Sequence, residues 1–423
     1  MKISEVRQEL SEGSLWAGVD VGKNSLFLVL RDVAGKFSRP WKANQPAELG
    51  ELVGRILELS TACPLVVALE STGTYGDALR QALTDANVSV ERVSGKATHD
   101  YAEIFDGVPS AHDGKDAAIV AELAALGKST PWPYQGASEE DAELARHVDW
   151  MDAQQDILQT WQGRLEGLLS RHWPEATRIF GLSSVTLLKV LSHYGGPAAL
   201  AQASEAEEQL SRWGGHFLKP EKIRRFVKSA ARTVGVRMTE VDLCRMKSYA
   251  QEARQAAGEV ERSKRALSRL SSENETLERQ AAVVGAPTAS VLWVSVGDPA
   301  DYRCGEAYRK AMGLNLKERS SGKYQGKLKI TKRGPGLARR WMFFAAMRIL
   351  QEPPVRDWFE AKKRKDNDRG LGAVVAVMRK LALALHAVGA EGEKFSRERL
   401  FPGRPFRGGK SGPHGRPSKI RKD

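Results

Sequence analysis

Short apolar runs separated by turn residues open the chain, and they predict β-strands. Leu15–Val21 and Leu26–Arg31 are β-rich runs on either side of Gly22-Lys23-Asn24, a spacing typical of a hairpin. Pro64–Glu70 is almost continuously apolar until its final carboxylate, which favours a strand buried on both faces. Val88–Val93 is a fourth candidate strand.

Helical patterns alternate with these strands. One begins at Thr72-Gly73-Thr74 and continues through Ala78, Leu79, Ala82 and Leu83, and an Ala-rich one covers Asp116–Leu126. Because strands and helices alternate, we expect an α/β domain that ends near Gly127, with Pro131-Trp132-Pro133 as its exit.

The middle of the chain carries helical periodicity only. Glu139–Trp173 predicts one long helix, Val236–Gln280 a second, and Phe180–Val234 a small helical insert with a basic stretch at Lys219–Lys228. The inward positions of the second helix keep a 3-4 spacing: Met246, Tyr249, Ala253, Ala256, Val260, Ser263, Leu267, Leu270, Asn274 and Leu277. This spacing indicates a weak coiled-coil seam or, alternatively, a core helix of a bundle.

The C-terminal third predicts a compact helical domain with a basic tail. Helices are expected at Thr288–Val296, Glu306–Met312 and about Leu337–Leu350, and the stretch after Phe401 has almost nothing to bury. We expect that tail to be disordered and to touch nucleic acid nonspecifically. The predicted domains are 1–130 (α/β), 131–283 (helical connector with insert), 284–392 (C-terminal domain) and 393–423 (basic tail).

Composition narrows the functional classes. With 65 Lys and Arg against 52 Asp and Glu, the formal net charge is +13, which favours a polyanionic partner such as nucleic acid. Charge alone does not separate this from an ordinary basic soluble protein. The cysteines Cys63, Cys244 and Cys304 are far apart, which argues against disulfides and structural zinc. No apolar signal core opens the chain and no apolar run approaches the roughly 18 residues of a membrane span, so a reducing cytoplasm is expected.

Four carboxylates stand where a metal site would need them. Asp20 and Glu70 come at the ends of predicted strands, and Asp113 and Asp116 are three apart at a helix start, so both can face one side. Such hard oxygen ligands suit Mg²⁺, and two ions could clamp a phosphodiester. Taken singly, the aspartates could be helix N-terminal charges or turn residues. Glu70 is harder to explain in this way, because five apolar residues lead directly into it.

A loop rich in serine, glycine and lysine is the second candidate site. Ser320 and Ser321 precede Gly322-Lys323, and cations follow at Lys327, Lys332, Arg333, Arg339 and Arg340. These donors could bind a phosphate, and Gly322, Gly326 and Gly334 could let the backbone approach it. A serine hydroxyl needs a base or metal to become a nucleophile, so on these residues alone an ordinary basic surface loop is the stronger interpretation.

Three segments resemble a known family. Ala17-Gly18-Val19-Asp20-Val21-Gly22-Lys23, Ala68-Leu69-Glu70-Ser71-Thr72-Gly73-Thr74-Tyr75 and His112-Asp113-Gly114-Lys115-Asp116-Ala117 resemble the DEDD transposases of the insertion-sequence one-ten family. The loop Gly313–Lys327 resembles the C-terminal transposase domain of that family, in which a serine before Gly-Lys is the nucleophile. The resemblance covers nearly the whole chain except the tail.

The resemblance implies a fold and a chemistry. The fold is α/β plus α: a RuvC-like domain of RNase H fold, a helical coiled-coil connector and a mostly helical transposase domain. Asp20, Glu70, Asp113 and Asp116 are implied as catalytic metal ligands that would hold two Mg²⁺ ions. Ser321 is implied as the nucleophile, with Ser320 as the second choice. Lys323, Lys327, Lys332, Arg333, Arg339 and Arg340 are the nucleic-acid-binding candidates.

The implied enzyme is an insertion-sequence DNA recombinase in a prokaryotic cytoplasm, associated with the nucleoid. It would cleave and rejoin donor and target DNA through a Mg-bound phosphodiester and a phosphoserine link, guided by a structured noncoding bridge RNA. It would work as a homo-oligomer, a tetramer built as a dimer of dimers, with the carboxylates of one subunit beside Ser321 of another and the coiled coil making the contacts.

The sequence departs from the family at several points. Val93-Ser94-Gly95 lacks an expected proline, Leu314-Asn315-Leu316 replaces an Ala-Pro-containing run, and the tail is long. Three alternatives stay open. A RuvC-like junction nuclease would keep the metal site without serine chemistry. A sugar-kinase or actin-like ATPase also begins with an Asp-x-Gly hairpin, but its second phosphate loop and adenosine motif are not found. The third is a noncatalytic RNA-binding or chaperone protein with a coiled coil.

Overall fold

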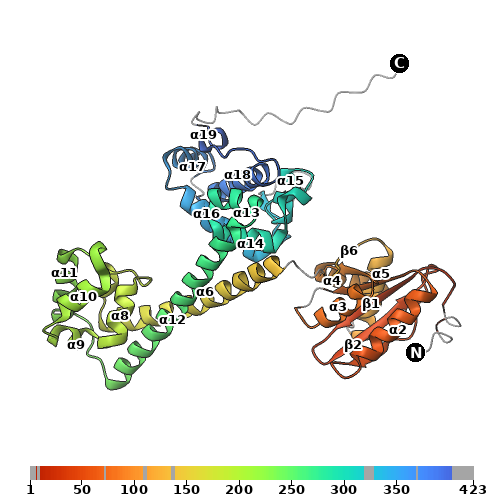
Figure 1. The fold of residues 1–423 in the computed structure, drawn as a ribbon, viewed down its shortest axis with the longest axis horizontal. Helices are drawn as coiled ribbons and strands as arrows, with labels where there is room; N and C mark the ends of the chain where they lie inside the picture. The colour runs from red at the N-terminus through yellow and green to blue at the C-terminus, as the bar shows by residue number, and fades with distance from the viewer. Residues whose placement is uncertain are drawn as a thin grey trace, which may run out of the picture. The chain divides into compact units, whose positions relative to one another are not determined.

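The computed structural model describes residues 6, 10–70, 73–107, 112–134, 139–318, 328–367 and 370–402. The chain divides into two compact units, Met1–Ala137 and Ser138–Asp423. Figure 1 shows a sheet with helices in the first unit and helices almost throughout the second.

The first unit is built on a mixed six-stranded sheet. Its strand order is β3-β2-β1-β4-β5-β6. Strands β1, β2 and β3 are antiparallel neighbours, β4 and β5 continue parallel to β1, and β6 is antiparallel to β5. The bounds are β1 Leu15–Val21, β2 Ser25–Arg31, β3 Trp41–Asn44, β4 Leu65–Glu70, β5 Ser89–Val93 and β6 Thr130–Pro131. An antiparallel meander that continues into parallel strands through helical crossovers confirms the predicted α/β fold of RuvC-like, RNase H type.

Helices cover both faces of this sheet. Helices α2 (Leu49–Ala62) and α3 (Asp77–Asp85) pack with the odd-numbered residues of β1 and β4 in one core. Helices α4 (Gly95–Asp106) and α5 (Asp113–Ala125) cover the other face, where Ala68 and Val93 meet Ile119 and Leu123. Since side chains alternate along a strand, the even-numbered residues of β1 and β4 point toward α4 and α5.

Two long helices run antiparallel in the second unit. These are α6 (Glu139–His172) and α12 (Glu240–Ser272). The first half of α6 shares a core with the second half of α12, through Leu144 and Leu267, and the second half of α6 packs with the first half of α12, through Leu165 and Met246. The inward face predicted for α12 therefore packs against α6 of the same chain, and contacts between subunits would need other faces of this pair.

The predicted helix Val236–Gln280 is wrong in its length. Thr239 begins α12 with a capping box to Asp242, and the helix ends at Ser272. A separate helix, α13 (Glu275–Val284), then begins at Asn274, whose side chain accepts a hydrogen bond from the Leu277 amide at 3.0 Å. Asparagine is favoured at the N-cap of a helix over the helix interior. Asn274, which the sequence pattern assigned to the coiled-coil seam, therefore begins a new helix.

A small helical insert joins the two long helices, as predicted. Its α-helices are α7 Ala176–Ile179, α8 Val185–Tyr194, α9 Pro197–Gln202, α10 Ala206–Gly214 and α11 Pro220–Ala231, with a 3-10 turn η1 at Gly215–Phe217. Their apolar faces enclose three aromatic rings. The ring of Phe226 lies 4.6 Å from that of Trp173 in a tilted contact and 4.8 Å from that of Phe180 in an edge-to-face contact, measured between centroids.

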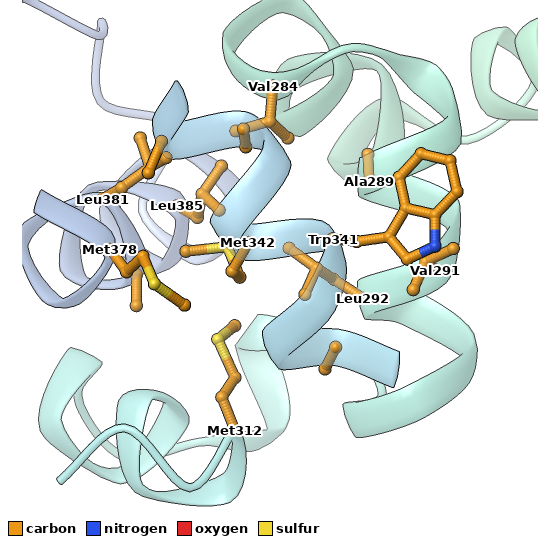
Figure 2. Close-up of a cluster of buried hydrophobic side chains, with 14 of the residues drawn as sticks. Val284, Ala289, Val291, Leu292, Met312, Trp341, Met342, Met378, Leu381 and Leu385 are labelled. Atoms are coloured by element: carbon orange, nitrogen blue, oxygen red, sulfur yellow. The ribbon is translucent and has the colours of Figure 1, made fainter. Parts of the chain in front are cut away.

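The C-terminal helices form the largest core of the chain. They are α14 Ala286–Val296, α15 Gly305–Ala311, α16 Gly336–Ile349, α17 Pro353–Lys365, α18 Gly370–Ala390 and α19 Arg397–Leu400, with η2 at Pro299–Asp301 and a hairpin of β7 (Leu316–Lys317) and β8 (Lys329–Ile330). Figure 2 shows side chains of α14, α16 and α18 meeting here, among them Leu292, Met342 and Leu381.

Helix α18 differs from the expectation that no segment approaches the length and apolar character of a membrane span. By length and composition, α18 is apolar enough to cross a membrane. Its charged pair is used within the unit, however: Arg379 donates to the Leu314 carbonyl at 3.0 Å and Lys380 to the Leu400 carbonyl at 2.8 Å. Leu381 and Leu385 are fully buried in the same core, so the apolar character of α18 is that of a core helix.

Candidate active site

Strand alternation brings Asp20 and Glu70 to one face of the sheet. Strands β1 and β4 are parallel neighbours, and Val19 pairs with Leu69. Asp20 and Glu70 are the next residues along these two strands, so both lie at the carboxyl edge and point to the face that α4 and α5 cover. Both side chains are partly exposed, as ligands of a bound ion must be.

Helix α5 brings the other two carboxylates to this edge. It begins at Asp113, after His112 caps it by accepting a hydrogen bond from the Lys115 amide at 3.1 Å. The helix packs very closely on β1, because a Cβ atom at Gly18 would lie 2.1 Å from the Ala117 carbonyl oxygen. Gly18 and Asp20 share a face of β1, so this close approach sets the first turn of α5 beside Asp20.

Electrostatics show that the four carboxylates influence one another. Burial raises the pKa of Asp20 to about 6, with further contributions from the negative charges of Asp116, Asp113 and Glu70. Burial also raises the pKa of Asp116, together with the charge of Asp113, against the opposing effects of His112 and Lys115. An excess of negative charge thus accumulates at the carboxyl edge of β1 and β4.

Two groups that the sequence analysis missed hold Glu70. The Thr98 hydroxyl, buried on α4, lies 2.8 Å from Oε2 of Glu70. Gly95, the first residue of α4, lies under the same carboxylate, where a Cβ atom would be 2.5 Å from Oε1. The only signal in the sequence is the departure at Val93-Ser94-Gly95, since a proline at position 95 would carry the Cβ that this contact excludes.

An ion pair between a buried lysine and an exposed aspartate ties α4 to the start of α5. Lys115, which stands between the two aspartates of α5, is almost fully buried and donates to Asp106 at 2.7 Å. Asp106 is the last residue of α4, the helix that carries Thr98. The lysine therefore links the support of Glu70 to the helix turn that bears Asp113 and Asp116, and a buried charge of this kind needs its partner.

The donor set fits a hard divalent cation. Four carboxylates supply the oxygen ligands that Mg²⁺ and similar ions prefer. A cation would offset both the burial and the repulsion that raise the pKa of Asp20. Within the described residues, no group of three or more His, Cys, Asp or Glu side chains is already gathered tightly enough to hold a metal ion.

The serine loop lies outside the described residues. This applies to Ser320, Ser321, Lys323 and Lys327. The four cations after the loop fall into two groups. Lys332 and Arg333 are exposed.

Arg339 and Arg340 are engaged within the chain. Arg339 donates to the Gly334 carbonyl at 2.6 Å, and Arg340 pairs with Asp152 and, at 3.2 Å, with Asp156 of α6. A phosphate bound by Arg340 would have to compete with these carboxylates.

Gly334 has a different role from the one expected. It adopts φ +147°, and a Cβ atom there would lie 2.2 Å from the Ala311 carbonyl oxygen. The glycine therefore lets the chain pack against the end of α15. This internal contact, and not the approach of a phosphate, explains why the position has no side chain.

Two family models match the chain on either side of the helical insert. A DEDD transposase model of the IS110 type matches residues 17–174, which include Asp20, Glu70, Asp113 and Asp116. A model described as "Transposase IS116/IS110/IS902 family" matches residues 279–359. The chain belongs to the IS110 family of transposases. It is therefore an enzyme of DNA cleavage and transposition, and its partner is DNA. DEDD enzymes of this kind depend on divalent metal ions.

Two curated insertion-element proteins are similar to this IS110-family chain. The insertion element IS900 uncharacterized 42 kDa protein of Mycobacterium paratuberculosis is 23% identical over 391 residues, 88% of this chain and 95% of that protein. The insertion element IS110 uncharacterized 43.6 kDa protein of Streptomyces coelicolor is 28% identical over 142 residues, 33% of this chain and 35% of that protein.

Solved structures of RuvC from Thermus thermophilus are also similar to part of the chain. One, in complex with a Holliday junction substrate, covers 28% of this chain and 99% of its own at 19% identity and a TM-score of 0.23. A second RuvC structure matches at 20% identity with a TM-score of 0.22. The fold assigned above rests on the strand order and register of this chain.

Proposed function

We propose that this IS110-family transposase cuts and transfers DNA strands at a metal site formed by Asp20, Glu70, Asp113 and Asp116. The observation that carries the proposal is geometric: Asp20 and Glu70 lie at the carboxyl ends of the parallel neighbours β1 and β4, and the first turn of α5 carries Asp113 and Asp116. Burial and the charges of the other three carboxylates raise the pKa of Asp20, which supports it. Clusters of carboxylates that perturb one another are typical of functional sites. When bound, Mg²⁺, as two ions, would stabilise the charge that develops on the phosphodiester during transfer.

In this proposal the four carboxylates differ in how they are held. Thr98 and Gly95 fix the Glu70 carboxylate, while Asp113 and Asp116 are carried by the first turn of α5. Asp20 is half-buried, so its interaction with the other three charges is screened less than at a fully exposed position. The chain thus provides an edge of concentrated negative charge in which Glu70 is held by a hydrogen bond from Thr98.

Ser321 is the nucleophile in the same proposal. Its hydroxyl oxygen forms a bond to phosphorus as the bond from phosphorus to a sugar oxygen breaks, and the released sugar hydroxyl takes up a proton equivalent to the one that the serine loses. One phosphate ester replaces another, so the DNA stays activated for rejoining as a phosphoserine link. Exposed Lys332 and Arg333 would bind the flanking phosphates. The support is the family resemblance of the loop, which the second family model spans.

Guidance and assembly complete the proposal. A structured noncoding RNA would select donor and target DNA by base pairing while the protein binds the backbone, which agrees with the +13 net charge. The protein would act as a tetramer, a dimer of dimers, in which Ser321 of one subunit serves the carboxylates of another. Its DNA substrate would place it in the prokaryotic cytoplasm, with the nucleoid.

A covalent protein–DNA adduct tests the serine chemistry. In cells that carry the gene in its native flanking DNA, a denaturing gel should show the adduct for wild type and Ser320→Ala. The adduct should be absent for Ser321→Ala and for Asp20→Asn. If wild type forms no adduct while cleavage still depends on Asp20, the enzyme is a metal-dependent nuclease without a serine nucleophile.

A further inference from the structure

A large hollow lies in the second unit beside the β7–β8 hairpin. Its volume is about 1190 Å³, and its walls come from the hairpin, α16, the end of α17 and the first half of α18. Its lining residues all belong to the second unit, whereas the four carboxylates all belong to the first. This volume exceeds what one drug-sized ligand needs.

The wall of the hollow is largely apolar. Its apolar lining is Leu316, Leu328, Ile330, Phe343, Leu371, Val375, Ala376 and Met378. Leu328 is 60% exposed and Leu371 is 70% exposed, so part of this apolar surface faces solvent. Phe343 supplies an aromatic ring to the lining, while its neighbour Phe344 lines a different pocket on the other side of α16.

Cations surround the same hollow. Lys317, Lys329 and Lys332 are exposed on and beside the hairpin, and Lys362, Arg339, Arg340 and Arg379 complete the set. Among the described lining residues the one acidic side chain is Asp366, and it accepts a hydrogen bond from Lys362 at 2.6 Å. Arg340 and Lys362 pair with carboxylates, so the positive charge of the rim comes mainly from exposed Lys317, Lys329 and Lys332 beside the apolar wall.

The apolar wall and the surrounding cations together indicate which kind of ligand fits the hollow. An apolar peptide or a second copy of the chain would have to bring many acidic groups to match the rim. An unpaired nucleotide matches both features of the hollow. Its base presents a flat face to the apolar wall, and its phosphates carry negative charge toward the cations. Double-stranded DNA keeps its bases stacked inside the helix and cannot offer a base to such a wall.

We propose that this hollow binds an unpaired nucleotide of DNA or RNA, with the base against Phe343 and the flanking phosphates on Lys317 and Lys329. The proposal rests on the proposed function only in that the ligand is a nucleic acid, and it does not depend on Ser321 or on a metal. Base contact with an aromatic side chain contributes about 1–3 kcal/mol by alanine substitution.

Anisotropy of labelled single strands tests this with the full-length protein, in the absence of divalent metal. Each strand of about 12 nucleotides is prepared as DNA and as RNA, with normal bases and with an abasic stretch. Wild type should bind the base-containing strand about tenfold more tightly than the abasic one. Whichever of DNA or RNA shows the larger preference is identified as the source of the nucleotide.

Matched variants locate the contact. Phe343→Ala should abolish the preference for bases and leave abasic affinity unchanged, while Phe344→Ala should keep the preference. Leu371→Asp, at an exposed position, gives a second test if Phe343→Ala does not fold. Lys317→Ala with Lys329→Ala should weaken both strands equally and reduce the salt dependence of binding.

Three results would overturn the proposal. Wild type could bind abasic and normal strands equally, or Phe343→Ala could keep the full preference. Leu371→Asp could change the oligomeric state with no effect on base preference, in which case a second copy covers the hollow. Binding is measured without metal and can be repeated in Ser321→Ala. A failure of the proposed catalytic chemistry would therefore leave these binding results unchanged, so the two proposals are tested separately.

Discussion

Glu70 shows how one side chain of the site is fixed by its surroundings. Thr98 lies 2.8 Å from one carboxylate oxygen, and Gly95 leaves space for the other. A hydroxyl that donates to a metal ligand orients it and changes its affinity for the ion. Thr98 is thus a positioning residue, which acts through Glu70.

Loss of this hydroxyl should weaken metal binding. We expect Thr98→Val to lower the affinity for Mn²⁺ by about 10-fold or more, and Thr98→Ser to restore it, because serine keeps the donor. Titration calorimetry with Mn²⁺ measures this without any DNA. Thr61→Val, at an exposed position of α2, is the control and should bind as wild type does. Equal affinity for wild type and Thr98→Val would remove Thr98 from the site.

Asp32 makes the stability of the first unit depend on pH. Burial alone would raise its pKa, but hydrogen bonds from the Ser11 amide and hydroxyl, at 2.9 and 2.7 Å, and from the Lys36 amide, at 2.8 Å, lower the pKa to about 2. Because the folded pKa lies below the unfolded value, the carboxylate stabilises the fold above about pH 4. This contribution is lost as the pH falls toward 2.

Urea unfolding between pH 7 and pH 2 measures this contribution. Asp32→Asn should be destabilised at pH 7 by about 1–3 kcal/mol, and the difference from wild type should shrink as the pH falls through this range. Asp85→Asn, exposed at the end of α3, should follow wild type at every pH. A constant difference between wild type and Asp32→Asn would show that the ionised carboxylate is not the cause.

At the scale of elements, the packing of α5 on β1 assembles the site. Gly18 allows backbone contact between them, because a Cβ atom would lie 2.1 Å from Ala117 and 2.3 Å from the Ala121 amide nitrogen. Backbone atoms cannot move aside as a flexible side chain can, so a larger residue must displace the helix that carries Asp113 and Asp116.

Gly18→Ala should therefore affect both stability and metal binding. We expect a destabilisation of about 1–3 kcal/mol and weaker Mn²⁺ binding, because the first turn of α5 moves away from Asp20. Gly54→Ala is the matched control, since Gly54 is at an exposed position of α2 and nothing lies within 4 Å of its added Cβ. Helix propensity predicts a small gain in stability for that control. Unchanged metal affinity in Gly18→Ala would contradict the positioning role of α5.

The elements with clear periodicity could be predicted from sequence. Strands β1, β2, β4 and β5 have the predicted positions to within one residue, because alternation and continuous apolar runs are strong signals. The division of α12 from α13 was missed, since the 3-4 spacing continues through Asn274 and only its capping side chain reveals the break. Strands β3 and β6, of 4 and 2 residues, are too short to carry a periodic pattern.

At the scale of the whole molecule, sequence order could suggest the site but not its supports. Asp20 and Glu70 could be placed at strand ends because parallel neighbours share an edge. Thr98 and Lys115 could not be assigned, since their contacts depend on how α4 folds back over the sheet. The hollow beside the hairpin was likewise not predictable, because it gathers residues from five separate elements, β7, β8, α16, α17 and α18.

The central claim is that the carboxylates of the first unit hold the metal that DNA strand cleavage requires. The most direct measurement is cleavage of plasmid DNA carrying the element ends, as a function of Mg²⁺ concentration, for wild type, Asp20→Asn, Asp116→Asn and the control Asp85→Asn. We predict Mg²⁺-dependent cleavage by wild type and Asp85→Asn, and a loss of about 100-fold or more in both site variants, equal to about 2.7 kcal/mol. Cleavage by Asp20→Asn at the wild-type rate and with the same Mg²⁺ dependence would contradict the account.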